Sequence, residues 1–441
     1  MFSLNTVKIY FRIAKLSNIF ISEIIKFYCS NFLYYHVCKL SPLNRLELIK
    51  KISKKLEKEN IVYVKIFQAL CLDKDLLYAN EIDYLIKYTD NVPYNVSEIN
   101  YALLNKLEED FSITLNNLQP INSGIVGLVF DGCDASNNKV IIKMLKNNIL
   151  ERFVAVFDEL LYISYILNLV PYIRSLKITK LLLNNKDIIL NQMDFSKELY
   201  AIEIFTDKYK NNKEYRFPKV YKEITEKYEN LLVMENIKGL TFKDIEPLNM
   251  SIKEEFGYLV NKFGMLGIVY HSVIHCDLHS GNVFFYINEN SNDGDLPKYQ
   301  LGIIDFGLSC FPNKENQYAY YIFFSDMHFN NDYSKIEQLA YSIIEEKERF
   351  ANLDPIIKRD FLLESIECLQ VNTKDDISSQ LLVEFSKILT KYDFNFTEEF
   401  NKVMLGIHTV NSLGKQLCKN LKSVQMKVIK DLTKINDLLE F

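Results

Sequence analysis

Two short segments constrain the fold of this chain more than any other feature: HCDLHSGN at 275–282 and IIDFG at 303–307. The first has the form HxDxxxxN, and the second holds Asp305 between apolar residues and a glycine, as after a buried strand. A phosphoryl-transfer site needs a carboxylate near the acceptor hydroxyl and oxygen ligands for magnesium. The pair therefore predicts Asp277 as the base or positioning carboxylate, with Asn282 and Asp305 as ligands of Mg²⁺.

Two further motifs precede this pair in the order expected of a nucleotide site. NSGIVGLV at 122–129 fits GxGxxGxV except at Asn122, and Gly124 and Gly127 would let backbone amides approach phosphates. Lys143 follows in VIIK on the next expected strand, where its ammonium group would reach the α and β phosphates of ATP. Each motif is weak alone, but four in this order predict a kinase-like binding site for Mg²⁺ and ATP.

Other interpretations of the same residues remain open. His271, His275 and His279 have the four-residue spacing of a zinc site, although a glycine-containing loop rather than a helix carries the last one. Glu151 and Glu159 are each candidates for a helical partner of Lys143, or are simply exposed.

The hydrophobic pattern divides the chain into helical and strand-rich parts. Residues 1–115 are helical in pattern, and 124–130 and 139–145 form a predicted hairpin around a polar turn. A helical pattern covers 147–215, and short strands are expected at 217–224 and 230–239. A helix at 252–272 leads into the first motif, strands are expected at 283–287 and 301–306, and the chain is helical after about 315.

Composition limits the class of protein and its partners. The net charge of −5 over 441 residues leaves no overall nucleic-acid footprint, so we expect no nucleic-acid partner. Eight scattered cysteines without a CxxC pair favour a reducing intracellular compartment. The first 40 residues carry five basic side chains against Glu23 alone, which suits an interfacial helix on a membrane, a mitochondrial transit segment, or a helix docked on its own protein.

The motif HxDxHxGN resembles the HADPHPGN of the UbiB, AarF and ADCK atypical kinases. Residues 63–93 are similar to the KxGQ stretch of that family, with Lys65 and Gln68 matching and Phe67 in place of its glycine. Residues 192–205 are similar to its ExDxxxEA stretch, with Asp194 and Glu198 matching and Gln192 in place of the first acid. The resemblance covers roughly residues 45–310, and the KxGQ block distinguishes this family from aminoglycoside phosphotransferases.

The resemblance implies an α+β, bilobal protein-kinase-like fold with a small sheet-containing N-lobe and a helical C-lobe. The implied parts are a helical extension at 1–115 that carries Lys65 and Gln68, an N-lobe at 116–238 and a C-lobe at 239–441. It further implies that Glu198 pairs with Lys143 and that adenine lies near Met234 and Asn236. The extension would fold over the site, favouring ATP binding or hydrolysis, or phosphorylation of a small or lipid-associated molecule, over ordinary protein phosphorylation. The family is linked to isoprenoid-lipid metabolism, notably ubiquinone biosynthesis.

Three departures from the family pattern bear on regulation. Gly124 stands where the family usually has alanine, and Phe67 and Gln192 replace a glycine and an acid. These changes predict a relaxed or altered lid over an intact nucleotide site. The leading hypothesis is an atypical kinase or ATPase of the UbiB type. The alternatives are a serine/threonine protein kinase proper, and a nucleotide-gated scaffold with vestigial catalysis.

Overall fold

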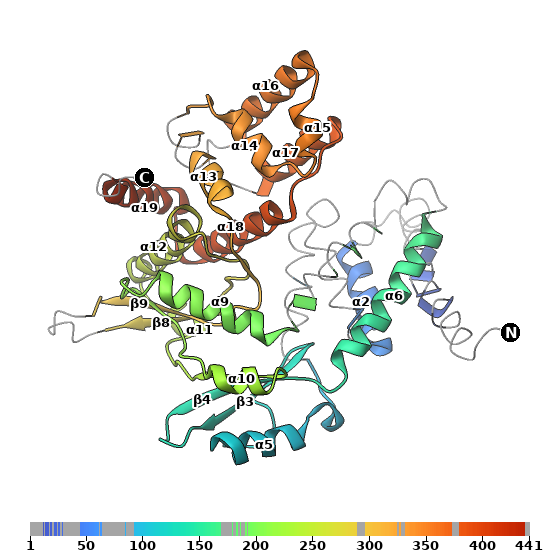
Figure 1. The fold of residues 1–441 in the computed structure, drawn as a ribbon, viewed down its shortest axis with the longest axis vertical. Helices are drawn as coiled ribbons and strands as arrows, with labels where there is room; N and C mark the ends of the chain where they lie inside the picture. Colours follow the sequence, from blue (N-terminus) through green and yellow to red (C-terminus); the bar gives the residue numbers. More distant parts are fainter. Residues whose placement is uncertain are drawn as a thin grey trace. The chain divides into compact units, whose positions relative to one another are not determined.

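The computed structural model gives the chain as two compact units (Figure 1). Unit 1 comprises Met1–Phe195 and Glu223–Val233, and unit 2 comprises Ser196–Lys222 and Met234–Phe441. The structure describes residues 45–60, 62–63, 84, 92–168, 193–288, 296–323, 326–327, 331–372 and 379–436, with single positions between 12 and 29 and between 179 and 191.

Unit 1 contains an antiparallel sheet built on the predicted hairpin. Strands β3 (Gly127–Cys133) and β4 (Lys139–Leu145) pair along their whole length, and alternate residues of each are buried, as the period of a strand requires. The short strands β1 (Thr114–Leu115) and β2 (Asn122–Ser123) pair with β3, and β6 (Leu231–Glu235) pairs with β4. The predicted hairpin is confirmed, although β3 begins at Gly127.

The helices of unit 1 include α2 (Arg45–Glu59), α5 (Tyr101–Phe111) and α6 (Ile149–Leu167). Asn100 caps α5, since its side chain accepts a hydrogen bond from the amide of Leu103. Apolar residues of α2 and α6 share one buried cluster, which includes Leu56 and Phe153. This cluster attaches the N-terminal helical residues to α6.

The described part of the first 30 residues makes ion pairs with the protein itself. Arg12 lies 3.3 Å from Glu159 and Lys15 lies 2.7 Å from Glu59. Glu23 is buried and accepts a hydrogen bond from Lys55 at 2.6 Å. At these positions the basic segment is a helix docked on its own protein.

Unit 2 contains two small sheets. Strand β9 (Tyr299–Ile303) lies between β8 (Val283–Ile287), antiparallel to it, and β5 (Tyr215–Arg216), parallel to it. A separate ribbon pairs β7 (Ile274–His275) with β10 (Ser309–Cys310). The two predicted motifs lie at the ends of these strands.

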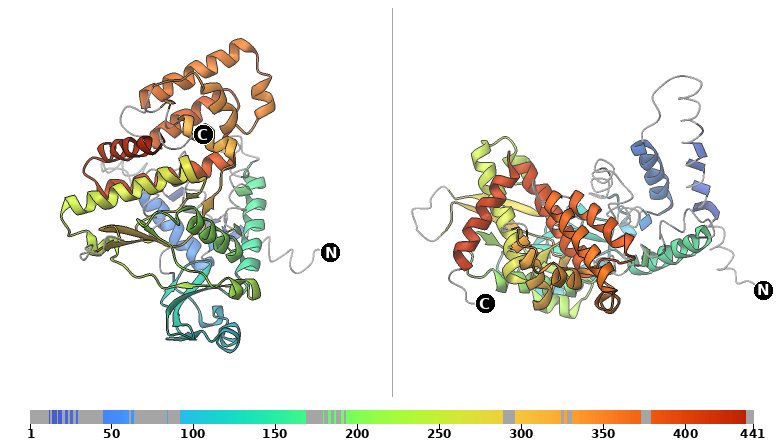
Figure 2. Two further views of the ribbon diagram at one scale, coloured as in Figure 1. Left: turned by 60° about the vertical axis from the view of Figure 1, so that its left-hand side comes forward. Right: turned by 90° about the horizontal axis from the view of Figure 1, so that it is seen from above.

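Helices make up most of the rest of unit 2 (Figure 2), and many of them contribute to a buried apolar cluster. The described helices are α9 (Phe195–Lys208, which starts at the unit boundary), α11 (Phe242–Ile245), α12 (Met250–Leu266), α13 (Lys314–Ile322), α14 (Ile336–Ile343), α15 (Lys347–Ala351), α16 (Pro355–Asn372), α17 (Ser379–Lys391), α18 (Glu398–Leu417) and α19 (Leu421–Asn436). A π-helical turn, Gly267–His271, joins α12 to the strand before the first motif.

The α+β class predicted from the sequence is confirmed by these small sheets and the many helices. The strand expected at 217–224 is wrong, because only an isolated bridge from Val220 to Met234 forms there and α10 (Lys222–Lys227) follows. The domain division at 115 and 238 stays a prediction. Within the described residues, no helix is both long and apolar enough to cross a membrane.

Candidate active site

The two motifs lie next to each other in unit 2 because strand pairing joins their ends. In the β8–β9 pair Val283 lies opposite Ile303, and the amide of Ile304 donates to the carbonyl of Asn282 at 3.0 Å. In the other ribbon the amide of Cys276 donates to the carbonyl of Leu308 at 2.9 Å. The HCDLHSGN loop and the IIDFG segment are thus held together on both sides.

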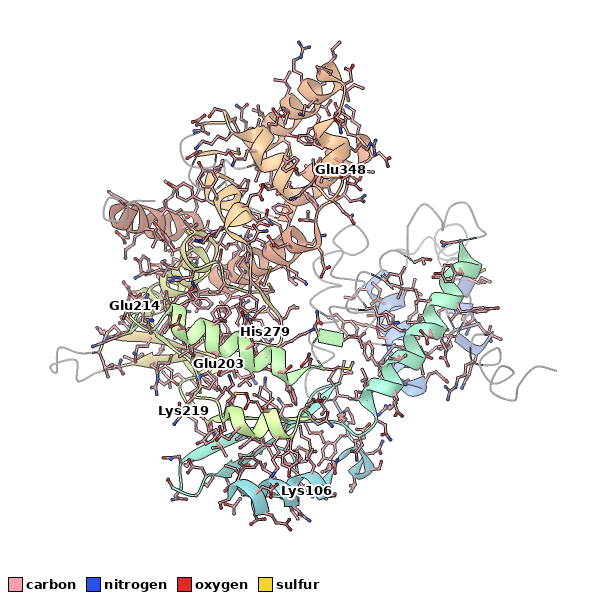
Figure 3. All side chains as sticks on the ribbon, in the orientation of Figure 1. Lys106, Glu203, Glu214, Lys219, His279 and Glu348 are labelled. Carbon is pink, nitrogen blue, oxygen red and sulfur yellow. The ribbon has the colours of Figure 1, made fainter. Side chains whose placement is uncertain are left out.

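Hydrogen bonds within the HCDLHSGN loop fix Asn282 relative to Asp277. The Nδ2 atom of Asn282 donates to the backbone carbonyl of Asp277 at 2.9 Å, and the amide of His279 donates to the same carbonyl at 3.0 Å. This bond uses the nitrogen of the Asn282 amide, so Oδ1 is the atom with which that side chain would bind a cation. The imidazole of His279, labelled in Figure 3, lies 3.8 Å from the Asp277 carboxylate, and both side chains are partly exposed.

His275 is a buried, neutral side chain that supports the loop. Its Nδ1 accepts the amide hydrogen of Asp277 at 3.2 Å, so its Nε2 carries the proton and donates to the carbonyl of Ile304 at 3.4 Å. Burial lowers the pKa of His275 to about 4, more than the nearby Asp305 carboxylate raises it. With both nitrogens engaged, this histidine connects the two motifs.

Asp305 has a left-handed backbone conformation, with φ of 62°. Such a conformation is unfavourable for residues with a side chain, although Asp tolerates it better than most, and it occurs more often at functional sites. The amide of Gly307 donates to Oδ1 of Asp305 at 3.4 Å. The backbone therefore leaves the extended path of β9 at Asp305, and the Asp305 carboxylate accepts a hydrogen bond within the turn that follows.

Glu198 contacts the IIDFG segment directly. Its buried Oε1 accepts a hydrogen bond from the amide of Phe306 at 3.2 Å. The ring of Phe306 packs against Phe205 and His275, with centroids 5.0 and 5.1 Å apart. Helix α9 thus holds the residue after Asp305 through both a carboxylate and an aromatic contact.

The glycine-containing loop and Lys143 lie in unit 1. The strand register places Asn122 opposite Val129 and Val129 opposite Lys143, so the loop and the lysine share one sheet. The loop is closed by the amide of Gly124, which donates to the carbonyl of Gly127 at 2.9 Å.

The two loop glycines differ in what they require. A Cβ on Gly127 would lie 3.1 Å from the carbonyl oxygen of Met144, whereas a Cβ on Gly124 would have its nearest neighbour at an ordinary 3.7 Å. Close backbone approach therefore favours glycine at 127 but places no such constraint at 124.

The remaining predicted residues fall in several places. Met234 is buried at the end of β6, and Asn236 follows that strand. Asp194 directly precedes α9. Lys65 and Gln68 lie outside the described residues.

The other candidates for partners and metals have different contacts. Glu159 is buried and is bonded to Arg12 and Tyr63, whereas Glu151 is exposed. The ring of His271 packs on Tyr209 with centroids 4.5 Å apart. In the part of the chain that the structure describes, no three His, Cys, Asp or Glu side chains gather as a metal site would need. These contacts do not support the zinc interpretation.

With this geometry in view, the comparisons with known proteins decide the family. The ABC1 atypical kinase-like domain matches residues 87–340, which is more than half of the chain. The chain belongs to this family. The match confirms the resemblance to UbiB, AarF and ADCK proteins and the kinase-like fold class.

Curated relatives of this ABC1 chain carry the UbiB name. It is 26% identical over 383 residues to the probable protein kinase UbiB of Shewanella sp. strain MR-4, covering 82% of this chain and 65% of the relative. The same figures hold for the UbiB protein of strain MR-7. The chain therefore spans less than two thirds of the length of these relatives.

Solved structures resemble this ABC1 chain more distantly. The complex of Rv3197 with erythromycin from Mycobacterium tuberculosis has a TM-score of 0.43 and 14% identity, covering 88% of this chain and 98% of that one. The Rio2 kinase–ADP/Mg²⁺–phosphoaspartate complex from Chaetomium thermophilum has a TM-score of 0.29 and 9% identity, covering 75% and 95%.

Proposed function

We propose that this ABC1-family chain is an atypical kinase or ATPase that binds Mg²⁺ and ATP and transfers or hydrolyses the γ-phosphate. The observation that carries the proposal is the bond from Asn282 Nδ2 to the Asp277 carbonyl, at the end of the hairpin that leads to Asp305. Strand pairing places the segments that carry Asp277, Asn282 and Asp305 next to each other, and carboxylate and amide oxygens are the ligand types that phosphoryl transfer requires, which supports the proposal.

The donor set fits a hard cation such as magnesium better than zinc or copper. Mg²⁺ is usually held by one or two carboxylates together with substrate phosphates and water, and Asn282 and Asp305 supply oxygen ligands only. When bound, the ion would offset the negative charge of the phosphates. No histidine is needed for this role, which agrees with the engaged ring nitrogens of His275.

The roles of the protein groups follow from their positions. Asp277 would orient the acceptor hydroxyl or water and accept its proton, because its partly exposed carboxylate lies on a loop fixed by Asn282 and His275. Glu198 would hold the turn after Asp305 through the Phe306 amide.

In unit 1, Gly124 and Gly127 would admit the phosphates to the loop backbone, and Lys143 would bind the α and β phosphates and pair with Glu198. Met234 and Asn236 would line the adenine site. Lys65, Gln68 and Asp194 would belong to a regulatory extension. The acceptor would be water or a small molecule of the isoprenoid-lipid class, with ubiquinone precursors as the example from the family.

The test is ATP turnover by the purified protein with Mg²⁺, comparing Asp305→Asn with Asp393→Asn. Both aspartates have left-handed backbones, with φ of 62° and 60°, but the Asp393 side chain lies exposed on the turn directly after α17 and pairs with Arg349. We expect the first variant to lose turnover and the second to keep it. Equal turnover in both variants would refute the role of Asp305.

Two measurements separate the alternatives. Mg²⁺ with ATP should raise the melting temperature of the wild-type protein, and a boost of turnover by anionic vesicles would direct the search for an acceptor to lipids. ATP binding without turnover, with activity of the protein in cells unchanged by Asp277→Asn, would favour the nucleotide-gated scaffold. Phosphorylation of general protein substrates would favour a protein kinase proper.

A further inference from the structure

Helix α18 lies beyond residue 340, where the match to the ABC1 domain ends, yet it contacts the HCDLHSGN loop. The Oγ1 atom of Thr409 accepts a hydrogen bond from the amide of Leu278 at 3.3 Å. One turn earlier, Gly406 lies so close to β7 that a Cβ would come within 2.5 Å of Cγ2 of Ile274 and 3.3 Å of the carbonyl oxygen of His275.

Close packing of α18 on α12 places it there. A Cβ on Gly264 would lie 2.9 Å from Cγ2 of Val410, and one on Gly257 would lie 2.1 Å from Sγ of Cys418. Since the residue numbers rise along one helix as they fall along the other, the helices are antiparallel, and Figure 2 shows α18 beside α12. Glycines on α12 let the two helices pack closely, and Gly406 lets α18 approach β7, so the short side chain of Thr409 reaches the HCDLHSGN loop.

The bond to Thr409 completes the support of one peptide group. The carbonyl of Asp277 accepts hydrogen bonds from Asn282 Nδ2 and from the amide of His279, while the other end of the same peptide, the amide of Leu278, donates to Thr409. Leu278 is fully buried, so its amide has no access to bulk water.

The Thr409 hydroxyl has a fixed direction, because it donates its own hydrogen to the carbonyl of Gly406 at 3.0 Å. Its lone pair is thereby directed at the loop rather than free to rotate. A rotation of the Asp277–Leu278 peptide would break hydrogen bonds at both its carbonyl and its amide. The Asp277 side chain would move with it.

We propose that Thr409 is a positioning residue for Asp277, acting through the Leu278 amide. The inference rests on the proposed function in that Asp277 has to be catalytic for the position to affect turnover. Small errors in the position of a catalytic group reduce the chemical step by up to about a hundredfold while leaving the binding of the nucleotide intact. We therefore expect an effect on kcat and not on the KM for ATP.

The experiment compares Thr409→Val, which keeps the shape and removes the acceptor, with Thr409→Ser, which keeps the hydroxyl. We expect Thr409→Val to lower kcat about tenfold with KM for ATP unchanged within about twofold, and Thr409→Ser to stay near the wild type. If Thr409→Val does not fold, Thr409→Ala gives the same comparison with Thr409→Ser. Equal kcat in the hydroxyl and non-hydroxyl variants would overturn the proposal.

Amide hydrogen exchange of the peptide containing residues 275–282 tests the positioning without any turnover. Loss of the acceptor should speed exchange at Leu278 in Thr409→Val but not in Thr409→Ser. If Thr409→Val exchanges faster at Leu278 but the wild-type protein shows no ATP turnover, the contact is upheld and the proposed function is rejected. Unchanged exchange, whatever the turnover, would reject the role of Thr409.

Discussion

Replacing Glu198 with alanine should destabilise unit 2 around the IIDFG segment. The Oε1 atom of Glu198 accepts from the Phe306 amide at 3.2 Å, and both residues are buried. Removing the carboxylate leaves that amide without this acceptor in a site closed to water. Because Phe306 is buried and its ring packs against those of Phe205, Phe217 and His275, a replacement water molecule would have little room.

The size of the effect follows from the cost of an unsatisfied buried donor, which is about 1–3 kcal/mol. Glutamine at this position keeps an acceptor oxygen of the same reach. It exchanges a charge-assisted bond for a neutral one, which is about half as strong. We therefore expect Glu198→Ala to lower the free energy of unfolding by about 1–3 kcal/mol, and Glu198→Gln to lower it by roughly half of that.

The assay is urea unfolding followed by far-UV circular dichroism, since the chain contains no tryptophan for fluorescence. Glu203, labelled in Figure 3, lies on the same helix with its partner Lys222 at 3.5 Å, and both side chains are partly exposed. A surface pair of this kind contributes about 0–1 kcal/mol, so Glu203→Ala is the matched control. If Glu198→Ala were no less stable than Glu203→Ala, the hydrogen bond from Phe306 to Glu198 would make no measurable contribution to stability.

Two further predictions concern stability. Burial holds the pKa of His275 at about 4, below its ordinary value of 6.5, so the unfolded chain binds more protons between these pH values. Stability should fall as the pH drops from about 6.5 to 4, by at most about 3 kcal/mol from this residue, and His275→Gln should flatten the slope of unfolding free energy against pH. Gly267→Ala would bring a Cβ within 2.4 Å of the Val273 carbonyl oxygen and should lower the free energy of unfolding by about 1–3 kcal/mol. A Cβ at Gly124 has its nearest atom at 3.7 Å, so Gly124→Ala should lower it by less than about 1 kcal/mol.

Each of these has a contrary outcome. The pKa of His271 is also lowered by burial to about 4, so a residual slope should remain in His275→Gln, and an unaltered slope would contradict a buried neutral His275. Equal unfolding midpoints for Gly267→Ala and Gly124→Ala would mean that the backbone around Gly267 shifts to accommodate the added methyl group without loss of stability.

The local patterns in the sequence predicted the elements that carry the motifs. The β3–β4 hairpin, the helix before HCDLHSGN and the strands around IIDFG follow from hydrophobic period and turn residues, which act over a few neighbouring positions. The strand expected at 217–224 was wrong, because pairing there extends only to Val220 and the polar residues after it form α10.

The sequence by itself predicted Asp277, Asn282 and Asp305 as the residues of a phosphoryl-transfer site, since they stand in recognisable spacings. Only the tertiary structure decided the contacts around these residues and around the other candidates. In the structure the Phe306 amide donates to Glu198, and the Leu278 amide donates to Thr409. The Glu159 carboxylate accepts hydrogen bonds from Arg12 and Tyr63. Thr409 follows Leu278 by more than a hundred residues and belongs to no motif, so no local pattern marks it. Its place depends on how closely α18 packs on α12, and that distance is set by glycines whose partners are distant in sequence.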